Sequence, residues 1–239
     1  MKKWETIKPG TFEQARHFYP KVLNSIIHPI VNFFFSMTSA QIIQRYCHLN
    51  PMTDPEGLKS ILENRTRHFF WGGTDLFCVT TEKGTRKMVV IETNSCPSGQ
   101  KSLPSFNDAL ELRGYRTLIS ESFLPALKSR RLPQGGLAVL YDKNYMEASG
   151  YAAALAEIAR EDVFLVPFFN GVDSGIVYEN EILCLITEDG GRLPIRAAIR
   201  YVTQKPWNRI PVGLKTFIYN PVLVCLSGGR NKMLAAKAY

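Results

Sequence analysis

A strand, a helix and a second strand in close succession constrain the fold of this chain most. Leu137 to Tyr141 is an apolar run, Tyr145 to Arg160 has a helical pattern, and Val163 to Phe168 is a second apolar run. Two strands joined by one helix form a parallel pair with a right-handed crossover, the usual unit of an open α/β sheet. The sequence therefore predicts an α/β core at about residues 136–168.

The segments around this core predict two further regions. Residues 1–64 are expected to be mostly helical, with Pro20 and Pro29 as breaks and a short helix at 56–63. Residues 65–239 are expected to form a mixed sheet with helices, an α/β (α+β) region. Its expected elements are a hairpin of 68–81 and 86–94 joined by 82–85, a helical stretch at 106–127 broken near Gly114, and strands at 176–178, 182–187, 194–202 and 220–226.

Composition restricts the class of protein only loosely. Hydrophobic residues make up 45% and charged residues 21% of the 239 residues, which is typical of a globular protein. The net charge of +8 permits an anionic partner. The densest cluster of basic residues, 128–131, follows a helical pattern and is interpreted as a helix terminus, so no nucleic-acid partner is expected.

Two patterns bear on location. Residues 22–44 carry no Asp, Glu, Lys or Arg, but the run contains Pro29 and many polar side chains, so we expect no membrane span. The five cysteines are odd in number and show no CxxC spacing, which argues against a disulfide framework or a zinc site and favours the cytoplasm. The oligomeric state stays open.

The end of the strand at 86–94 contains the strongest candidate site. Glu92 and Asn94 lie two residues apart, so their side chains point to the same face of the strand. Carboxylate and amide oxygens suit Mg²⁺, which proteins usually hold through one or two carboxylates plus substrate phosphates. Asp75, on the preceding strand, is a third candidate if the hairpin register brings it beside Glu92. A polar turn at the end of a buried strand would give a similar pattern.

Several common catalytic motifs are absent. The segment 97–102 lacks the first Gly and the spacing of a phosphate loop, and no G-x-S-x-G, H-E-x-x-H or G-x-G-x-x-G occurs. The sequence thus provides no motif support for serine hydrolases, zincins or simple dinucleotide-binding enzymes.

From about residue 66 onward, the chain resembles the circularly permuted ATP-grasp ligases, such as glutathionylspermidine synthase. The resemblance rests on four segments in the same order along the chain. They are the Asp-bearing strand at 73–77, the E-x-N-x-x-P-S strand end at 92–98, the strand 196–202 leading into Lys205-Pro206-Trp207, and Asn220-Pro221 followed by Gly229-Arg230-Asn231-Lys232.

The resemblance implies an ATP- and Mg²⁺-dependent ligase that joins a small-molecule or peptide carboxylate to an amine through an acyl phosphate. Asp75, Glu92 and Asn94 would hold Mg²⁺, Arg200 would face the phosphates or the substrate, and Lys232 would lie near the nucleotide. The family commonly has an Arg where this chain has Gly73, so either Arg65 or Arg67 would have to replace it or the role is absent.

The family order places the nucleotide-gripping strand and lid after residue 239. The final helical pattern also has no stop signal before Tyr239. We therefore expect an N-terminal fragment that is inactive alone. The alternative is a non-catalytic α/β binding module or a degenerate relative of the ligases.

Overall fold

The computed structural model describes residues 3–17, 29, 33–34, 36–64, 66–95, 113–225 and 233. The chain divides into two compact units, one of residues 26–67 and one of residues 1–25 with 68–239. The segments at 96–102 and 229–232, and hence the candidate Lys232, lie outside the described residues.

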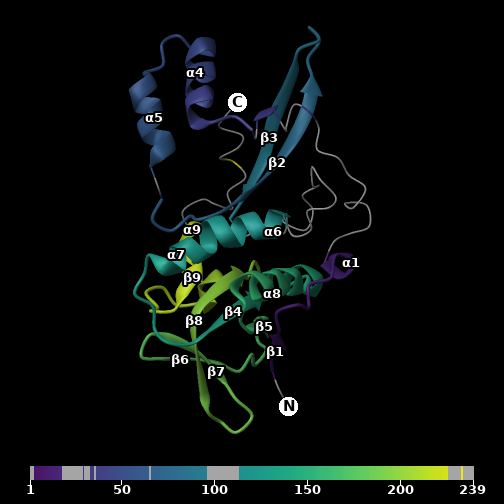
Figure 1. Ribbon diagram of the computed structural model, residues 1–239, viewed down its shortest axis with the longest axis vertical. Coiled ribbons are helices and arrows are strands. Elements are labelled where there is room, and N and C mark those ends of the chain that lie inside the picture. The colour runs from purple at the N-terminus through teal and green to yellow at the C-terminus, as the bar shows by residue number, and fades with distance from the viewer. Residues whose placement is uncertain are drawn as a thin grey trace. The chain divides into compact units, whose positions relative to one another are not determined.

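The unit of residues 26–67 contains two helices, α4 (Ser39–Leu49) and α5 (Pro55–Glu63), which pack on one another (Figure 1). Thr38 and Gln41 form a capping box at the start of α4. Asp54 caps α5, and Pro55 occupies its first turn, where the missing N–H costs nothing. The helix predicted at 56–63 is therefore confirmed. Neither helix has a buried residue.

The larger unit is built on one mixed sheet of seven strands in the order β1-β5-β4-β8-β7-β6, with β9 beside β8. Strands β5, β4, β8 and β9 are mutually parallel, whereas β1, β7 and β6 run antiparallel to their neighbours. The bounds are β1 (Glu5–Ile7), β4 (Gly136–Tyr141), β5 (Val163–Pro167), β6 (Ile176–Glu179), β7 (Ile182–Ile186), β8 (Arg192–Tyr201) and β9 (Phe217–Tyr219). The mixed α/β class and the parallel strand-helix-strand unit are thus confirmed.

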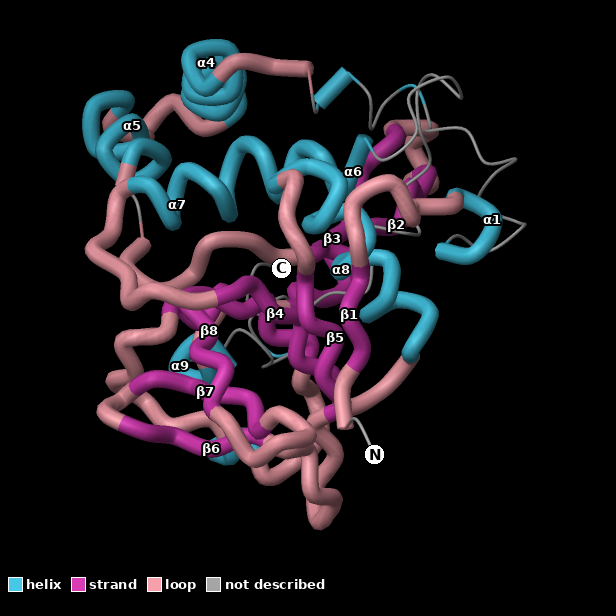
Figure 2. Tube along the Cα trace, turned by 60° about the horizontal axis from the view of Figure 1, so that its bottom comes forward, coloured by secondary structure: helices cyan, strands magenta, loops and turns pink. Residues whose placement is uncertain are grey.

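Helix α8 (Tyr145–Ala159) connects β4 to β5 and packs on one face of the sheet (Figure 2). Leu137, Val139 and Tyr141 face this layer, while Ala138 and Leu140 contribute to the core on the other face. Both faces of β4 are therefore buried, as expected for a strand whose sequence is a continuous apolar run.

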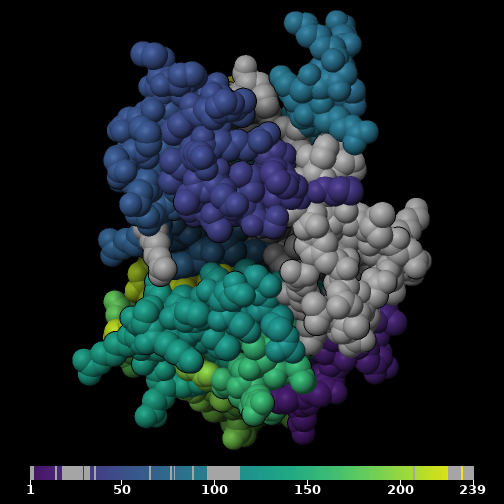
Figure 3. Space-filling view, turned by 45° about the horizontal axis from the view of Figure 1, so that its top comes forward, coloured from purple at the N-terminus to yellow at the C-terminus, as the bar shows by residue number. Residues whose placement is uncertain are grey.

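A helical run of α6 (Arg113–Thr117), a π-helical turn (Leu118–Phe123) and α7 (Leu124–Lys128) packs against α8. Its teal side chains form a continuous surface in Figure 3. Gly114 is the second residue of α6, and residues 106–112 lie outside the described residues, so the break predicted near Gly114 stays a prediction. The run approaches α8 closely, because a Cβ on Gly150 would lie 2.5 Å from the Tyr115 hydroxyl oxygen.

The remaining elements lie outside these layers. Strands β2 (Gly73–Thr80) and β3 (Arg86–Asn94) form a separate antiparallel hairpin, which confirms the predicted one. Short helical turns occur at α1 (Gln14–His17), at the 3-10 turn Trp207–Arg209 and at α9 (Val222–Val224).

Two features differ from the sequence prediction. The first 64 residues include β1, which pairs with β5 and so belongs to the sheet of the larger unit. The strand predicted at 220–226 is wrong, because β9 ends at Tyr219 and Asn220 adopts a left-handed conformation with φ of 55°. Pro221 then opens a helical turn.

In the part of the chain that the structure describes, no helix is long and apolar enough to cross a membrane.

Candidate functional site

The hairpin register brings the three candidate metal ligands to one face. Asp75 is directly opposite Glu92, and Asn94 is opposite Gly73, which has no side chain to cover it. The Asn94 side-chain nitrogen donates to Glu92 Oε1 at 3.0 Å. A register shift follows between Asp75 and Leu76, so the bulge separates the polar base of the hairpin from its outer part. The structure thus places the predicted residues together.

The three side chains differ in exposure. Asp75 is exposed, whereas Glu92 and Asn94 are half-buried. Two carboxylates directly opposite each other repel, and a bound cation relieves such repulsion. The donor set of two carboxylates and one amide fits Mg²⁺, which commonly keeps water or phosphate oxygens as its other ligands. Among the described residues, no group of three or more His, Cys, Asp or Glu could hold a metal ion.

Asn220 fastens the base of the hairpin to the end of β9. Its Oδ1 accepts from the Phe70 N–H at 2.8 Å. Its Nδ2 donates to the carbonyl oxygens of Trp71 at 2.5 Å and Ser95 at 2.7 Å. Trp71 and Ser95 flank the two strands that carry the candidate ligands, and Asn220 is fully buried. One side chain therefore holds both strand ends, and it does so at the carboxyl end of a parallel strand, the edge where open α/β sheets bind ligands.

Arg200 supports Asn220 from inside the sheet. Only 2% of Arg200 is exposed. Its Nε donates to the Asn220 carbonyl oxygen at 2.5 Å, Nη1 to the Val202 carbonyl oxygen at 2.7 Å, and Nη2 to Cys225 Sγ at 3.2 Å. These bonds hold the left-handed backbone at Asn220 in place. The role of Arg200 in facing phosphates or a substrate stays a prediction.

Sequence reasoning missed a buried ion pair at the carboxyl end of β4. Asp142 is fully buried, and its Oδ2 accepts a hydrogen bond from Arg209 Nη2 at 2.7 Å. The backbone N–H groups of Thr203 and Gln204 also donate to it, at 2.9 and 2.7 Å. The pair holds the segment after β8 against the carboxyl end of β4, the strand that lies between β5 and β8 in the sheet. The signal in the sequence was the acidic residue directly after an apolar strand, while its partner could not be read.

Aromatic residues pack against the Asn220 anchor. The Tyr219 ring stacks on Trp71 with centroids 6.1 Å apart, and the Tyr219 hydroxyl donates to Ser122 Oγ at 2.6 Å. Burial disfavours the phenolate and raises the pKa of Tyr219 to about 12. The layer beneath the hairpin base is therefore apolar, and its tyrosine stays protonated at neutral pH.

The chain was compared with protein-family models, curated proteins and solved structures, and none of them matches it.

Proposed function

We propose that this chain supplies the metal-binding part of an ATP- and Mg²⁺-dependent ligase. The enzyme would join a small-molecule or peptide carboxylate to an amine through an acyl phosphate. Asp75, Glu92 and Asn94 would hold Mg²⁺, Lys232 would lie near the nucleotide, and Arg200 would face the phosphates or the substrate. When bound, Mg²⁺ would neutralise charge that develops during phosphoryl transfer.

The observation that supports this proposal best is the register of the hairpin. Asp75 and Glu92 are paired across the two strands, and Asn94 is hydrogen-bonded to Glu92 on the same face. The Asn220 bonds hold the base of the hairpin at the end of β9, so the ligands would be held before the cation binds. Such preorganisation reduces the cost of binding.

One observation favours the alternative of a non-catalytic α/β binding module. The Arg200 donors named above go to two carbonyl oxygens and a thiol inside the fold, which is what a purely structural arginine would do. In this alternative, the hairpin base would be a rigid polar corner, and neither Mg²⁺ nor ATP would bind there.

Binding of Mn²⁺ as a paramagnetic substitute for Mg²⁺ distinguishes the two functions. The 239-residue chain is titrated with Mn²⁺, with and without ATP, while free Mn²⁺ is measured by electron paramagnetic resonance. Glu92→Gln keeps an acceptor for Asn94 but removes the charge, and we expect it to weaken Mn²⁺ binding at least about tenfold, as for loss of one charged ligand. Glu82→Gln, in the exposed turn of the same hairpin, is the matched control and should bind as the parent does.

Equal Mn²⁺ affinities of the Glu92→Gln variant, the Glu82→Gln variant and the parent would refute the site. Mn²⁺ binding that depends on Glu92 would support the metal site, whether or not ATP improves that binding.

A further inference from the structure

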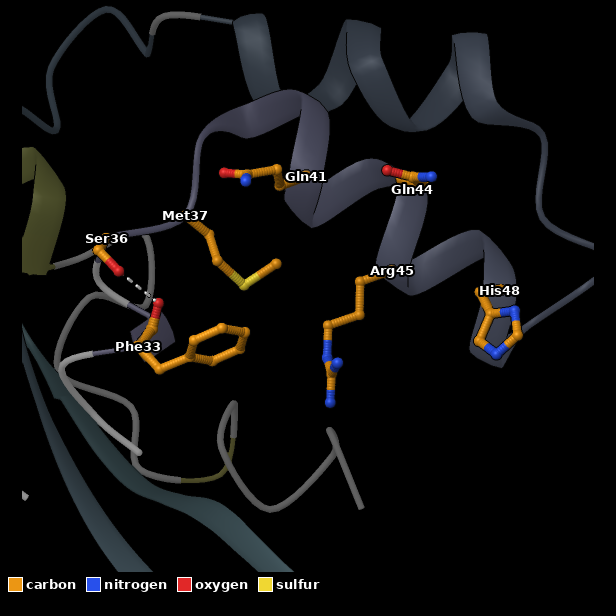
Figure 4. A pocket seen from close by; sticks show the side chains of 7 residues that line it. All are labelled: Phe33, Ser36, Met37, Gln41, Gln44, Arg45 and His48. Atoms are coloured by element: carbon orange, nitrogen blue, oxygen red, sulfur yellow. Dashed lines mark hydrogen bonds between the residues drawn. The ribbon is translucent and has the colours of Figure 1, made fainter. Parts of the chain in front are cut away.

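A pocket of about 460 Å³ lies in the unit of residues 26–67 (Figure 4). The candidate metal ligands belong to the other unit and are distant from the pocket residues in the sequence. The pocket is formed by one face of α4 and by the segment that precedes this helix. Its volume is in the range of small-molecule sites, and it is an open hollow, because six of its seven lining residues are exposed.

The lining has an apolar part and a polar part. Phe33 and Met37 lie before α4, and in Figure 4 their side chains point into the same space as that of Arg45. The helix contributes Gln41, Gln44, Arg45 and His48, which follow the i, i+3, i+4, i+7 spacing of a single helix face. A ligand there would meet a ring and a thioether at one end and hydrogen-bond donors at the other.

The polar part is biased toward donors. Gln41 Oε1 already accepts from the Thr38 N–H at 2.8 Å and from the Thr38 hydroxyl at 3.0 Å. A ligand would therefore meet the NH₂ end of the Gln41 amide. Arg45 adds a guanidinium, whose fork of N–H groups matches a carboxylate.

The charge around Arg45 is uncompensated on its own segment. No Asp or Glu occurs between Glu13 and Asp54. Across the described ranges, Arg45 forms no ion pair, whereas Arg16, Arg192, Arg196 and Arg209 each contact a carboxylate. The Arg45 guanidinium carbon lies 5.3 Å from the centre of the Phe34 ring, a cation–π contact that does not neutralise the charge. The pocket therefore has a positive end and an apolar end.

We infer that this pocket binds a small aromatic carboxylate. The carboxylate would pair with Arg45, and the aromatic ring would lie against Phe33 and Met37. The site is independent of the function proposed above, because none of its residues belongs to the hairpin or to the Asn220 network.

Naphthoate is a suitable probe, because it combines a carboxylate with a flat apolar body. The 239-residue chain is titrated with naphthoate by calorimetry, and amide shifts of α4 are followed by NMR. We expect saturable binding with shifts concentrated on α4. Naphthamide, which has the same shape without the charge, should bind at least about tenfold more weakly, because hydrogen bonds to charged groups are stronger than neutral ones.

Arg45→Gln removes the charge from the pocket, and Lys59→Gln removes the same charge from α5, outside the pocket. We expect Arg45→Gln to weaken naphthoate binding about tenfold and Lys59→Gln to leave it unchanged, with the α-helical circular dichroism of both variants equal to that of the parent. If Arg45→Gln unfolds α4, the comparison of naphthoate with naphthamide on the parent decides whether binding depends on the charge of the carboxylate.

The inference would be overturned by the absence of saturable binding, by equal affinities for naphthoate and naphthamide, or by an Arg45→Gln variant that is folded and binds as the parent does. Inorganic phosphate binding as tightly as naphthoate would also overturn it, since the apolar end of the pocket would then contribute nothing.

Discussion

Replacing Asn220 by glycine tests whether one side chain holds the hairpin on the sheet. Asn220 has φ of 55°, and glycine adopts this left-handed conformation without strain. The substitution therefore removes the side-chain bonds and leaves the backbone unstrained. Because the side chain is fully buried, solvent does not replace these bonds freely.

Three hydrogen bonds are lost, those to the Phe70 N–H and to the Trp71 and Ser95 carbonyl oxygens. A buried hydrogen bond contributes about 1 kcal/mol net, and a buried group left without a partner costs more. We therefore expect Asn220→Gly to lower the free energy of unfolding by about 3 kcal/mol, measured by urea denaturation. Hydrogen exchange of the Phe70 amide should accelerate as well, because its acceptor is gone.

Asn180→Gly is the matched control. Asn180 also has a left-handed φ, of 52°, but it lies in the exposed turn between β6 and β7. The same change there should alter stability by less than about 0.5 kcal/mol. If Asn220→Gly is as stable as Asn180→Gly, and the Phe70 amide stays protected, the hairpin is held by something else and the reasoning is wrong.

Three further predictions concern the larger unit. Arg209→Gln leaves the buried Asp142 carboxylate with only the neutral donors of Thr203 and Gln204, so we expect a loss of about 2 to 3 kcal/mol in urea denaturation; an unchanged midpoint would contradict the role of the pair. Gly150→Ala gains helix propensity but forces a methyl group against the Tyr115 hydroxyl, so the melting temperature should fall by an amount equivalent to at least about 1 kcal/mol. A higher melting temperature would show that α8 and the helical run that contains Tyr115 can move apart at little cost in free energy. The pKa of Tyr219 is raised to about 12 in the folded protein, above the usual value of about 10, so the unfolded chain loses the proton first and stability falls as the pH rises from about 10 to about 12. Tyr219→Phe should therefore show a shallower decline of stability over that pH range, when followed by denaturant midpoints, and an equally steep decline would assign it to other tyrosines.

Local elements of the fold could be predicted because they depend on periodicity. The apolar runs at β4 and β5 with a helical pattern between them specify a parallel pair, and the turn at 82–85 specifies a hairpin. The three-residue strand β1 could not be predicted, because so short an edge strand is defined by its pairing with β5 and has no pattern of its own. The last strand was misplaced because the left-handed turn at Asn220 depends on contacts with Arg200 and the hairpin.

The candidate site divides in the same way. The sequence alone determined that Glu92 and Asn94 share a face, because side chains in a strand alternate. Only the tertiary structure decided that Asp75 lies opposite Glu92 and that Asn220 holds the base of their hairpin. Residue spacing specifies to which face of one strand a side chain points, whereas a hydrogen bond between Asn220 and Ser95 joins positions far apart in the chain. Such partners depend on how the strands pack, and that packing is settled by the whole core at once.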